Sequence, residues 1–347
     1  MHLYFSTVLR NAPTLRGGEL VRLDWRTKEV LARTPIAATE PPIDDPNPRG
    51  NTRGGRGVAL VGDSVAVCSY HTVRLFDRAL RPLRDVSHPL MVGLHEVDLT
   101  ARGTLWVTST AIDAAIEIDL ETGKAVRELW PRELPGIQRS LDVEPLAIDK
   151  AADNRVRFLD GDHLRNRHHL HLNAVAEHAG DVYALFNRVG AIANLDRDEV
   201  VVRDKGIRRG HNLLIDASGL ALVNDTSKRH VYGFDLASGE RTFGIDLMEL
   251  APVARLARFR DPLRELKLSL HKRGLLSLAP PKPIFVRGLA RHRGSLFVGL
   301  SPATILEIEE ASGRLVDWFT FDRRVHACIH GIAVDPQAGS PHSDTCR

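Results

Sequence analysis

Short apolar runs separated by turn residues recur along the chain. The pattern is clearest in residues 210–240, GHNLLIDASGLALVNDTSKRHVYGFDLASGE. Its three apolar segments are short and rich in Val, Leu, Phe and Tyr, which favours strands over helices. The turns at residues 217–219 and 238–239 supply the glycine and serine chemistry that hairpins need. The pattern predicts consecutive antiparallel hairpins.

Similar copies recur at other places, and a repeated supersecondary unit is typical of propellers. First strands are expected near residues 56, 95, 173, 211, 287 and 330, and fourth strands at 124–129, 241–247 and 314–319. The strand at 329–334 has no partner after it, while the N-terminal strands lack a first strand. Joining them closes the ring and leaves no open edge. We therefore predict an all-β fold, a six-bladed β-propeller with four-stranded blades.

Three long connections interrupt the repeats, at residues 34–55, 130–170 and 248–283, within a single domain spanning 1–347. The first is rich in proline, and the third carries apolar residues at helical spacing among many Arg and Lys. We expect one or two amphipathic helices in the third, interrupted at Pro262. Each connection precedes a first strand, so all three are expected on one face, as binding loops or as an oligomer contact.

Composition narrows the range of functions. The net charge of +3 over 347 residues argues against a dedicated nucleic-acid binder, which would neutralise many phosphates. The three cysteines form no CxxC pair, so no disulfide framework or zinc knuckle is indicated. The chain has neither a signal-peptide pattern at its start nor an apolar run of about 18 residues. We expect a cytoplasmic protein without a membrane partner, and the oligomeric state stays open.

The third-strand endings FDLASGE, IDLETGK and IEEASGR, together with the HNLLIDASGLALV hairpin, resemble six-bladed propellers of the SMP-30, NHL and strictosidine-synthase type. The resemblance covers nearly all of the chain outside the insertions, and it concerns architecture. Gluconolactonases of the SMP-30 kind hold calcium or zinc with glutamate, asparagine and aspartate at inner blade positions. Here the equivalent positions are mostly His and Arg, so that activity does not carry over.

In a propeller the first strands line the central channel, so the residues that open them are neighbours in space. In chain order they are Arg56, His95, Asn173, His211, Arg287 and His330. Histidine occupies alternate blades. Three imidazoles around one axis suit a zinc, iron or copper ion and leave open coordination positions. Carotenoid cleavage oxygenases hold iron on axial histidines, although with seven blades and four histidines, so that analogy is one of geometry only.

Arg56 and Arg287 would lie beside such a metal, and two guanidiniums there suggest a carboxylate or phosphate substrate. Asn173 would help to orient it. His171 becomes the axial residue of the third blade if the register shifts by two. Glu96 and Asn212 follow axial histidines, so strand alternation predicts that both point away from the channel.

These observations leave two functions open. The first is a metal-dependent enzyme with His95, His211 and His330 as ligands and a small anionic or polar substrate. Both a lyase or hydrolase and an oxygenase fit that ligand set. The second is a non-catalytic propeller that binds a ligand or protein at the same channel mouth, with polar residues that satisfy one another.

Overall fold

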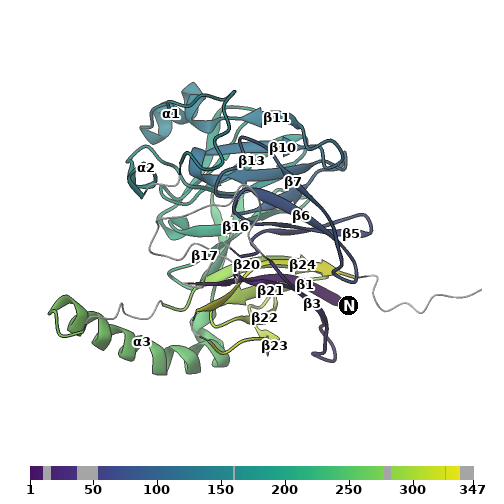
Figure 1. The fold of residues 1–347 in the computed structure, drawn as a ribbon. Helices are drawn as coiled ribbons and strands as arrows, with labels where there is room; N and C mark the ends of the chain where they lie inside the picture. Colours follow the sequence, from purple (N-terminus) through teal and green to yellow (C-terminus); the bar gives the residue numbers. More distant parts are fainter. Residues whose placement is uncertain (11–16, 37–53, 159–160, 277–282, 325, 337–347) are drawn as a thin grey trace, which may run out of the picture.

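The structure, a computed structural model, describes residues 1–10, 17–36, 54–158, 161–276, 283–324 and 326–336. Six four-stranded antiparallel sheets form a ring (Figure 1). The prediction of a six-bladed β-propeller is confirmed. Blade 1 contains β4 (Val58–Val61), β5 (Ser64–Cys68), β6 (Thr72–Asp77) and β7 (Pro82–Ser87). Blade 2 contains β8 (Val97–Leu99), β9 (Leu105–Ser109), β10 (Ala114–Ile118) and β11 (Ala125–Leu129).

The next three blades repeat this order from the inner to the outer strand. Blade 3 contains β12 (Leu172–His178), β13 (Asp181–Phe186), β14 (Ala191–Asn194) and β15 (Glu199–Arg203). Blade 4 contains β16 (Gly210–Ile215), β17 (Leu220–Asp225), β18 (His230–Asp235) and β19 (Arg241–Asp246). Blade 5 contains β20 (Val286–His292), β21 (Ser295–Leu300), β22 (Thr304–Glu309) and β23 (Leu315–Thr320).

Blade 6 joins the two ends of the chain. Its inner strand is β24 (Ala327–Asp335), followed outward by β1 (His2–Leu9), β2 (Glu19–Asp24) and β3 (Val30–Pro35). β24 pairs antiparallel with β1 from His2↔Asp335 to Leu9↔Ala327. The predicted closure is confirmed, and it pairs an edge that would otherwise be open.

The hydrophobic core is divided among the interfaces between blades. The buried apolar residues form six clusters, and each lies between two neighbouring blades. Trp106 of blade 2, for example, belongs to the same cluster as Phe186 of blade 3. Middle strands are covered on both faces, so strands such as β9 are buried along their full length. Burial on both faces explains why the sequences of the middle strands are continuous apolar runs.

The repeated third-strand endings form one kind of turn. The Asp235 carboxylate accepts hydrogen bonds from the backbone N–H groups of Ala237 and Ser238, and Gly239 follows at φ 73°. Asp119 does the same with the N–H groups of Glu121 and Thr122 in blade 2. An aspartate that accepts backbone N–H groups and a glycine at positive φ end the third strand, so the motif reflects turn chemistry.

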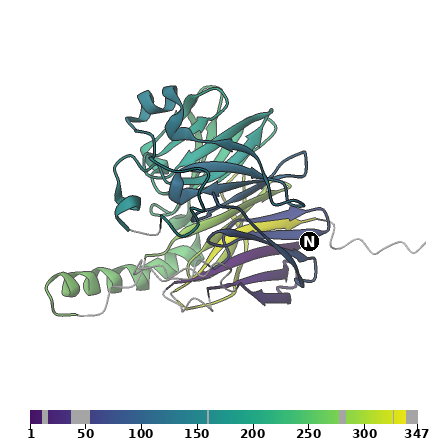
Figure 2. The same ribbon diagram turned by 45° about the horizontal axis from the view of Figure 1, so that its top comes forward.

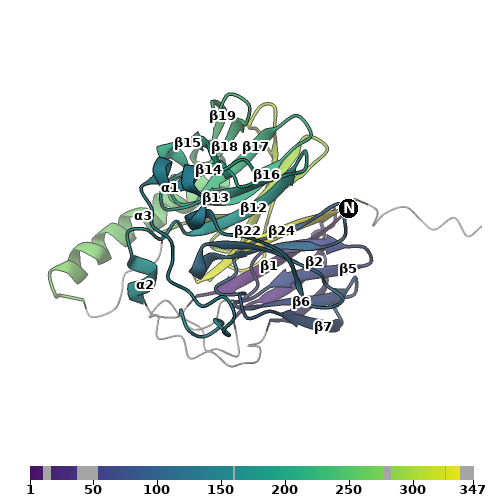
Figure 3. The same cartoon turned by 90° about the horizontal axis from the view of Figure 1, so that it is seen from above.

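The second and third insertions carry the helices. The second holds η3 (Pro131–Glu133), α1 (Pro135–Leu141) and α2 (Gly161–Arg165), and the third holds η5 (Leu247–Glu249) and α3 (Ala251–Lys272). α1, α2 and α3 lie on the same side of the ring, at the left of Figures 1 and 3. Residues 37–53 of the first insertion and 277–282 of the third lie outside the described residues. None of the described helices is long and apolar enough to cross a bilayer.

The expected interruption at Pro262 was wrong. α3 is one helix of 22 residues that runs through Pro262 and extends away from the blades (Figure 2). Proline removes one backbone hydrogen bond within a helix. Pro262 is exposed, so water can reach the carbonyl group that loses its partner.

Ser6 ties the closing blade to the first blade, and its loss is expected to destabilise the ring. Its buried hydroxyl donates to the carbonyl of Arg56 at 2.5 Å and accepts the N–H of Gly331 at 2.9 Å. Ser6→Ala leaves that buried N–H without its partner, so we expect a loss of about 1–3 kcal/mol in the free energy of unfolding, measured by urea titration. Ser64→Ala, on the second strand of blade 1, is the control and should cost less than about 0.5 kcal/mol. Equal effects of the two substitutions would contradict the bridging role.

Candidate functional site

A β-bulge opens the inner strand of every blade. In blade 6, His330 and Gly331 both lie opposite Ser6, because the register of β24 and β1 shifts between the pairs Ile329↔Thr7 and Ile332↔Phe5. In blade 2, the hydroxyl of Thr108 accepts the N–H groups of both His95 (3.1 Å) and Glu96 (2.9 Å). Bulges of this kind redirect side chains and are often found beside functional sites.

The other four blades show the same irregularity at the equivalent place. The residues at these bulges are Arg56 and Gly57 in blade 1, Asn173 in blade 3, His211 and Asn212 in blade 4, and Arg287 and Gly288 in blade 5. The bulge breaks strand alternation, so two consecutive residues can face the axis. The six residues expected to open the inner strands therefore all stand at bulges.

Four histidines converge at the axis. The ring centroids of His95 lie 5.2 Å from those of His171 and 5.9 Å from those of His211 and His330. The rings of His211 and His330 are 5.7 Å apart. The three histidines that the sequence predicted as metal ligands are thus brought together. His171 joins them from the residue before β12.

His171 reaches the axis because its backbone leaves the extended conformation. Its φ is 58°, in the left-handed region that few non-glycine residues adopt. The backbone N–H of Asn187 donates to its carbonyl group at 3.1 Å, which holds this turn next to β12. In blade 3, the ring of His171 contacts the axial His95, while the Asn173 amide contacts Nδ1 of His211.

All four imidazoles are neutral near neutral pH. Burial is the main cause that holds the pKa values of His95, His171, His211 and His330 well below the usual range. Arginine charges act in the same direction. Among the charged groups, Arg56 lowers the pKa of His95 most, and Arg287 lowers the pKa values of His211 and His330 most. Neutral imidazoles keep a lone pair for a metal or a hydrogen bond.

The contacts of His211 set its tautomer. The Asn173 amide donates to the Gly210 carbonyl (2.9 Å) and to Nδ1 of His211 (3.0 Å), which leaves the proton of His211 on Nε2. The Arg56 guanidinium donates to the ring of His95, with its Nη1 atom 2.7 Å from Nδ1 and 3.0 Å from Nε2. Nδ1 of His95 also lies 3.1 Å from the carbonyl oxygen of Gly93.

His330 differs from the other axial histidines in its contacts. Its side chain is buried, and among the described residues neither Nδ1 nor Nε2 has a hydrogen-bond partner. A buried polar group without a partner is costly, so such groups are rare in native proteins. The position of His330 within the histidine cluster points to a ligand that completes its hydrogen bonding or coordination.

Positive charge surrounds the cluster. Arg56 is buried and donates to the carbonyl of Leu94 at 2.8 Å, so its guanidinium is held at the axis. Arg287 is half-buried, and its guanidinium carbon lies 5.4 Å from the ring centroid of Phe285. The guanidinium carbon of Arg10 lies 3.8 Å from the centroid of the same Phe285 ring, and the charge of Arg10 also lowers the pKa of His330. This arrangement of guanidiniums suits a carboxylate or a phosphate.

Glu96 and Asn212 form a layer beneath the histidines. The expectation that both point away from the channel was wrong, because the bulges turn them inward. The Asn212 amide donates to the Glu96 carboxyl across the axis, and its oxygen accepts from Gly288 N–H (2.8 Å) and from the Asn224 amide (2.9 Å). Burial raises the pKa of Glu96 to about 8.

Glycines make room for this layer. A Cβ on Gly57 would lie 2.3 Å from a Glu96 carboxyl oxygen, and one on Gly331 would lie 2.2 Å from the Arg56 carbonyl oxygen. Blades 1, 5 and 6 therefore place glycine after the axial residue, while blades 2 and 4 place Glu96 and Asn212 there. The Glu96–Asn212 pair joins blades 2 and 4 across the axis.

Two more histidines extend the cluster into the second insertion. The ring of His169 lies 5.3 Å from that of His171, and the ring of His163 on α2 lies 5.8 Å from that of His169. Nε2 of His169 donates to the Thr110 carbonyl at 2.9 Å. His169 and His171 both belong to the RHHLH sequence at 167–171, directly before β12.

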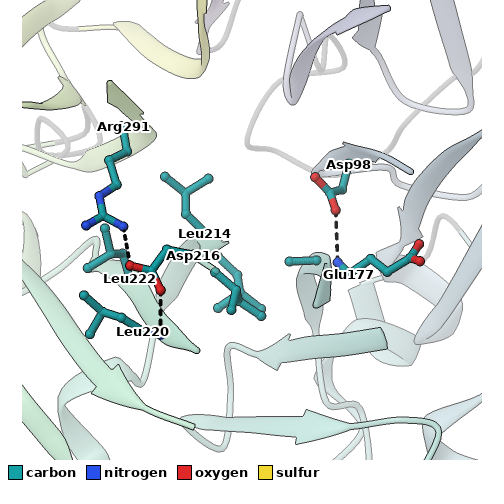
Figure 4. A pocket seen from close by; sticks show the side chains of 10 residues that line it. Asp98, Glu177, Leu214, Asp216, Leu220, Leu222 and Arg291 are labelled. Atoms are coloured by element: carbon teal, nitrogen blue, oxygen red, sulfur yellow. Dashed lines mark hydrogen bonds and ion pairs between the residues drawn. The ribbon is translucent and has the colours of Figure 1, made fainter. Parts of the chain in front are cut away.

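A separate cavity of about 330 Å³ lies at the other end of the inner strands, between blades 2, 3, 4 and 5 (Figure 4). Leucines of β16 and β17 form its apolar wall. Asp216 accepts from Arg291 at 2.6 Å, which holds the pKa of that carboxyl well below its usual range. Asp98 accepts the N–H of Glu177 at 3.1 Å, and burial raises its pKa to about 6. No pattern in the sequence predicts this cavity.

The axial histidine side chains are not arranged as a metal site in this structure. Among the described residues, no three His, Cys, Asp or Glu side chains are arranged so that they could hold an ion. In the histidine cluster, Arg56 meets a ring nitrogen of His95 and Asn173 meets one of His211. Both contacts would have to change before a metal could bind all four rings.

Comparison with known proteins supports the fold. No family model matches the chain, and no curated protein is significantly similar in sequence. A protein of unknown function from Bacteroides caccae matches with a TM-score of 0.58 and 11% identity, over 95% of this chain and 97% of that chain. A chain of a nidogen–laminin complex matches with a TM-score of 0.53 and 12% identity, over the same shares. Streptogramin B lyase matches with a TM-score of 0.45 and 11% identity, over 77% of this chain and 69% of that chain. The structural likeness places this chain among β-propellers and leaves the SMP-30, NHL and strictosidine-synthase type as a resemblance.

Asp98 provides a test of the electrostatics of the cavity. Its folded pKa of about 6 lies above the ordinary 3.8, so its contribution to stability is full below about pH 4 and is lost as the pH rises through 6. Asp98→Asn removes the ionisable carboxyl group and therefore this loss of stability at higher pH. The variant should match the wild type near pH 4 and exceed it by up to roughly 3 kcal/mol at neutral pH in urea unfolding.

Asp216→Asn is the matched control in the same cavity. Its folded pKa is lowered, mainly by the hydrogen bond from Arg291, so its contribution is present at neutral pH and is lost in acid. This variant should be less stable than the wild type at neutral pH and should approach it as the pH falls. If both variants show the same sign of pH dependence, the assignment for Asp98 is wrong.

Proposed function

We propose that the histidine cluster at the axis is the active site of a metal-dependent enzyme that acts on a small anionic substrate. The observation that carries this proposal is the convergence of four neutral imidazoles from four parts of the chain, in which the buried His330 has both ring nitrogens without a partner among the described residues. Neutral imidazole is a common ligand for zinc, iron and copper. The arginines beside the cluster supply the anion specificity.

The ring separations fit this use. Ligand nitrogens about 2.0–2.1 Å from a tetrahedral ion place neighbouring imidazole centroids roughly 5 Å apart. The ring of His95 lies 5.2–5.9 Å from the other three, and the rings of His211 and His330 are 5.7 Å apart, close to this value. His95, His171, His211 and His330 would hold the ion, one more ligand than the three expected from the sequence. A bound ion would polarise a substrate oxygen or lower the pKa of a water molecule.

The remaining residues have roles that follow from their contacts. Arg287 and Arg56 bind the anionic group of the substrate, and Arg56 leaves the ring of His95 when that group takes up its hydrogen bonds. Asn173 fixes the orientation of the His211 ring. Glu96 and Asn212 close the pocket from below, which limits access of water to the mouth side. The half-buried His171 faces that mouth.

Metal content tests the ligand assignment. Untagged protein should carry a stoichiometric transition metal in elemental analysis, or should bind zinc, iron or copper when it is added. His330→Ala and His171→Ala should reduce metal affinity by at least tenfold, since each removes a ligand. His178→Ala, at the far end of β12, is the control and should keep the metal. Wild-type protein that neither carries nor takes up a metal would overturn the assignment.

A second function is favoured by the contacts that Arg56 and Asn173 already make with ring nitrogens. With those contacts in place, the Nε2–H of His211 and the guanidiniums form a set of donors for an anion. The pocket would then bind a small carboxylate or phosphate without metal chemistry, as a non-catalytic propeller that senses a ligand or presents it to a protein partner. If the protein binds small anions but no metal, this second function is the correct one.

Anion binding is measured with inorganic phosphate as the probe. The dissociation constant from calorimetry should rise by roughly 10–100-fold in Arg287→Gln, because a hydrogen bond between charged groups contributes about 1.5–3 kcal/mol. Arg293→Gln, at the exposed turn between β20 and β21, is the matched control and should bind like the wild type. A wild type that does not bind phosphate or small carboxylates such as malonate would contradict the anionic substrate class.

A further inference from the structure

The helix α3 is anchored on one face only. Val253 and Ala257 are buried, and Val253 belongs to the core cluster between blades 4 and 5. Arg229 at the base of blade 4 pairs with Asp261 at 2.7 Å. Beyond this point the helix extends away from the ring in all three views (Figures 1–3).

Another face of α3 carries a row of apolar side chains, of which three are exposed and two are half-buried. The row, here called the apolar stripe, consists of Leu256, Phe259, Leu263, Leu266 and Leu270. Spacings that alternate between three and four residues place all five on one side of a helix. Phe259 is 72% exposed, Leu263 49% and Leu266 57%. Large apolar side chains gathered in one exposed row are typical of an interaction surface.

Charge on α3 is distributed around this stripe. The helix holds six Arg and Lys residues against two acidic residues. By helical spacing, Arg255 and Arg258 follow one edge of the stripe and Lys267 follows the other, whereas the guanidinium of Arg260 is buried. Asp261 and Glu265 lie on the far side. Long basic side chains beside an apolar stripe can reach anionic groups while the apolar residues are buried.

The flanking charges argue against a second copy of α3 as the occupant. If two stripes packed together, the basic residues at the stripe edges, Arg255, Arg258 and Lys267, would line the seam from both helices, and like charges there oppose association. An anionic bilayer surface satisfies both features, since its acyl region accepts the apolar residues and its headgroups pair with the basic ones. A helix that lies in the plane of such a surface binds it without a membrane-spanning segment.

We propose that α3 docks this protein on an anionic lipid surface, with the apolar stripe inserted at the headgroup level. The sequence-based expectation of no membrane partner considered spanning segments and does not address a helix that lies in the interface. The proposal is independent of the chemistry at the propeller axis. Because α3 is anchored beside blades 4 and 5, the docked protein would keep its ring outside the bilayer.

Vesicle co-sedimentation of the full chain tests this proposal. Phosphatidylcholine vesicles that contain phosphatidylserine should bind the protein at least tenfold more strongly than phosphatidylcholine alone, and added salt should weaken this binding. The double substitution Phe259→Ser and Leu266→Ser should reduce the partition coefficient at least tenfold. Charge reversal by Arg255→Glu and Lys267→Glu should do the same. All four positions lie on the surface, so the melting temperature should stay close to that of the wild type.

The matched control replaces two exposed apolar residues on outer strands, Leu83→Ser on β7 and Val126→Ser on β11, which are exposed to a similar degree. This control should bind vesicles like the wild type. Three outcomes would overturn the proposal. They are equal binding to both kinds of vesicle, no effect of the stripe substitutions, and a stripe-dependent dimer in light scattering without vesicle binding, which would assign the stripe to a second copy of the chain.

Discussion

Crowding of backbone at the propeller axis is the constraint on which the site depends. Six inner strands meet there, and each carries a β-bulge near the axis, which in blades 2 and 4 turns the residue after the histidine inward as well. Only some positions in the second layer can carry a side chain, since a Cβ at Gly331 would overlap the carbonyl of Arg56. The bulges and the glycines together allow imidazoles above and the Glu96–Asn212 pair below.

This arrangement separates two electrostatic environments along one channel. At the histidine end, arginines are the charged neighbours and the imidazoles stay neutral. At the other end, Asp98, Glu177 and Asp216 line a cavity with one arginine, Arg291. The histidine end, with its arginines, favours an anionic ligand, and the carboxylate-lined cavity favours a ligand that donates hydrogen bonds. The inner strands of blades 2, 3, 4 and 5 supply both ends, because each of them runs from the histidine cluster to the cavity.

Most of the fold could be predicted from the sequence because its signals are local. The Asp-x-x-x-Gly turns, the short apolar runs and the unpaired terminal strands require no knowledge of distant contacts. The alternation of His95, His211 and His330 followed from the repeat itself. α3 shows the limit of such local rules, because Pro262 marks a helix end in isolation, whereas an exposed helix tolerates it.

The sequence by itself determined the number of blades, their closure and the residue types that open the inner strands. Only the tertiary structure decided which of these side chains meet. A bulge depends on how two strands pair, so strand alternation misplaced Glu96 and Asn212, and the left-handed backbone of His171 gave no periodic signal. Likewise, the contacts of Arg56 and Asn173 with ring nitrogens join different blades, and such contacts form only when the ring has closed.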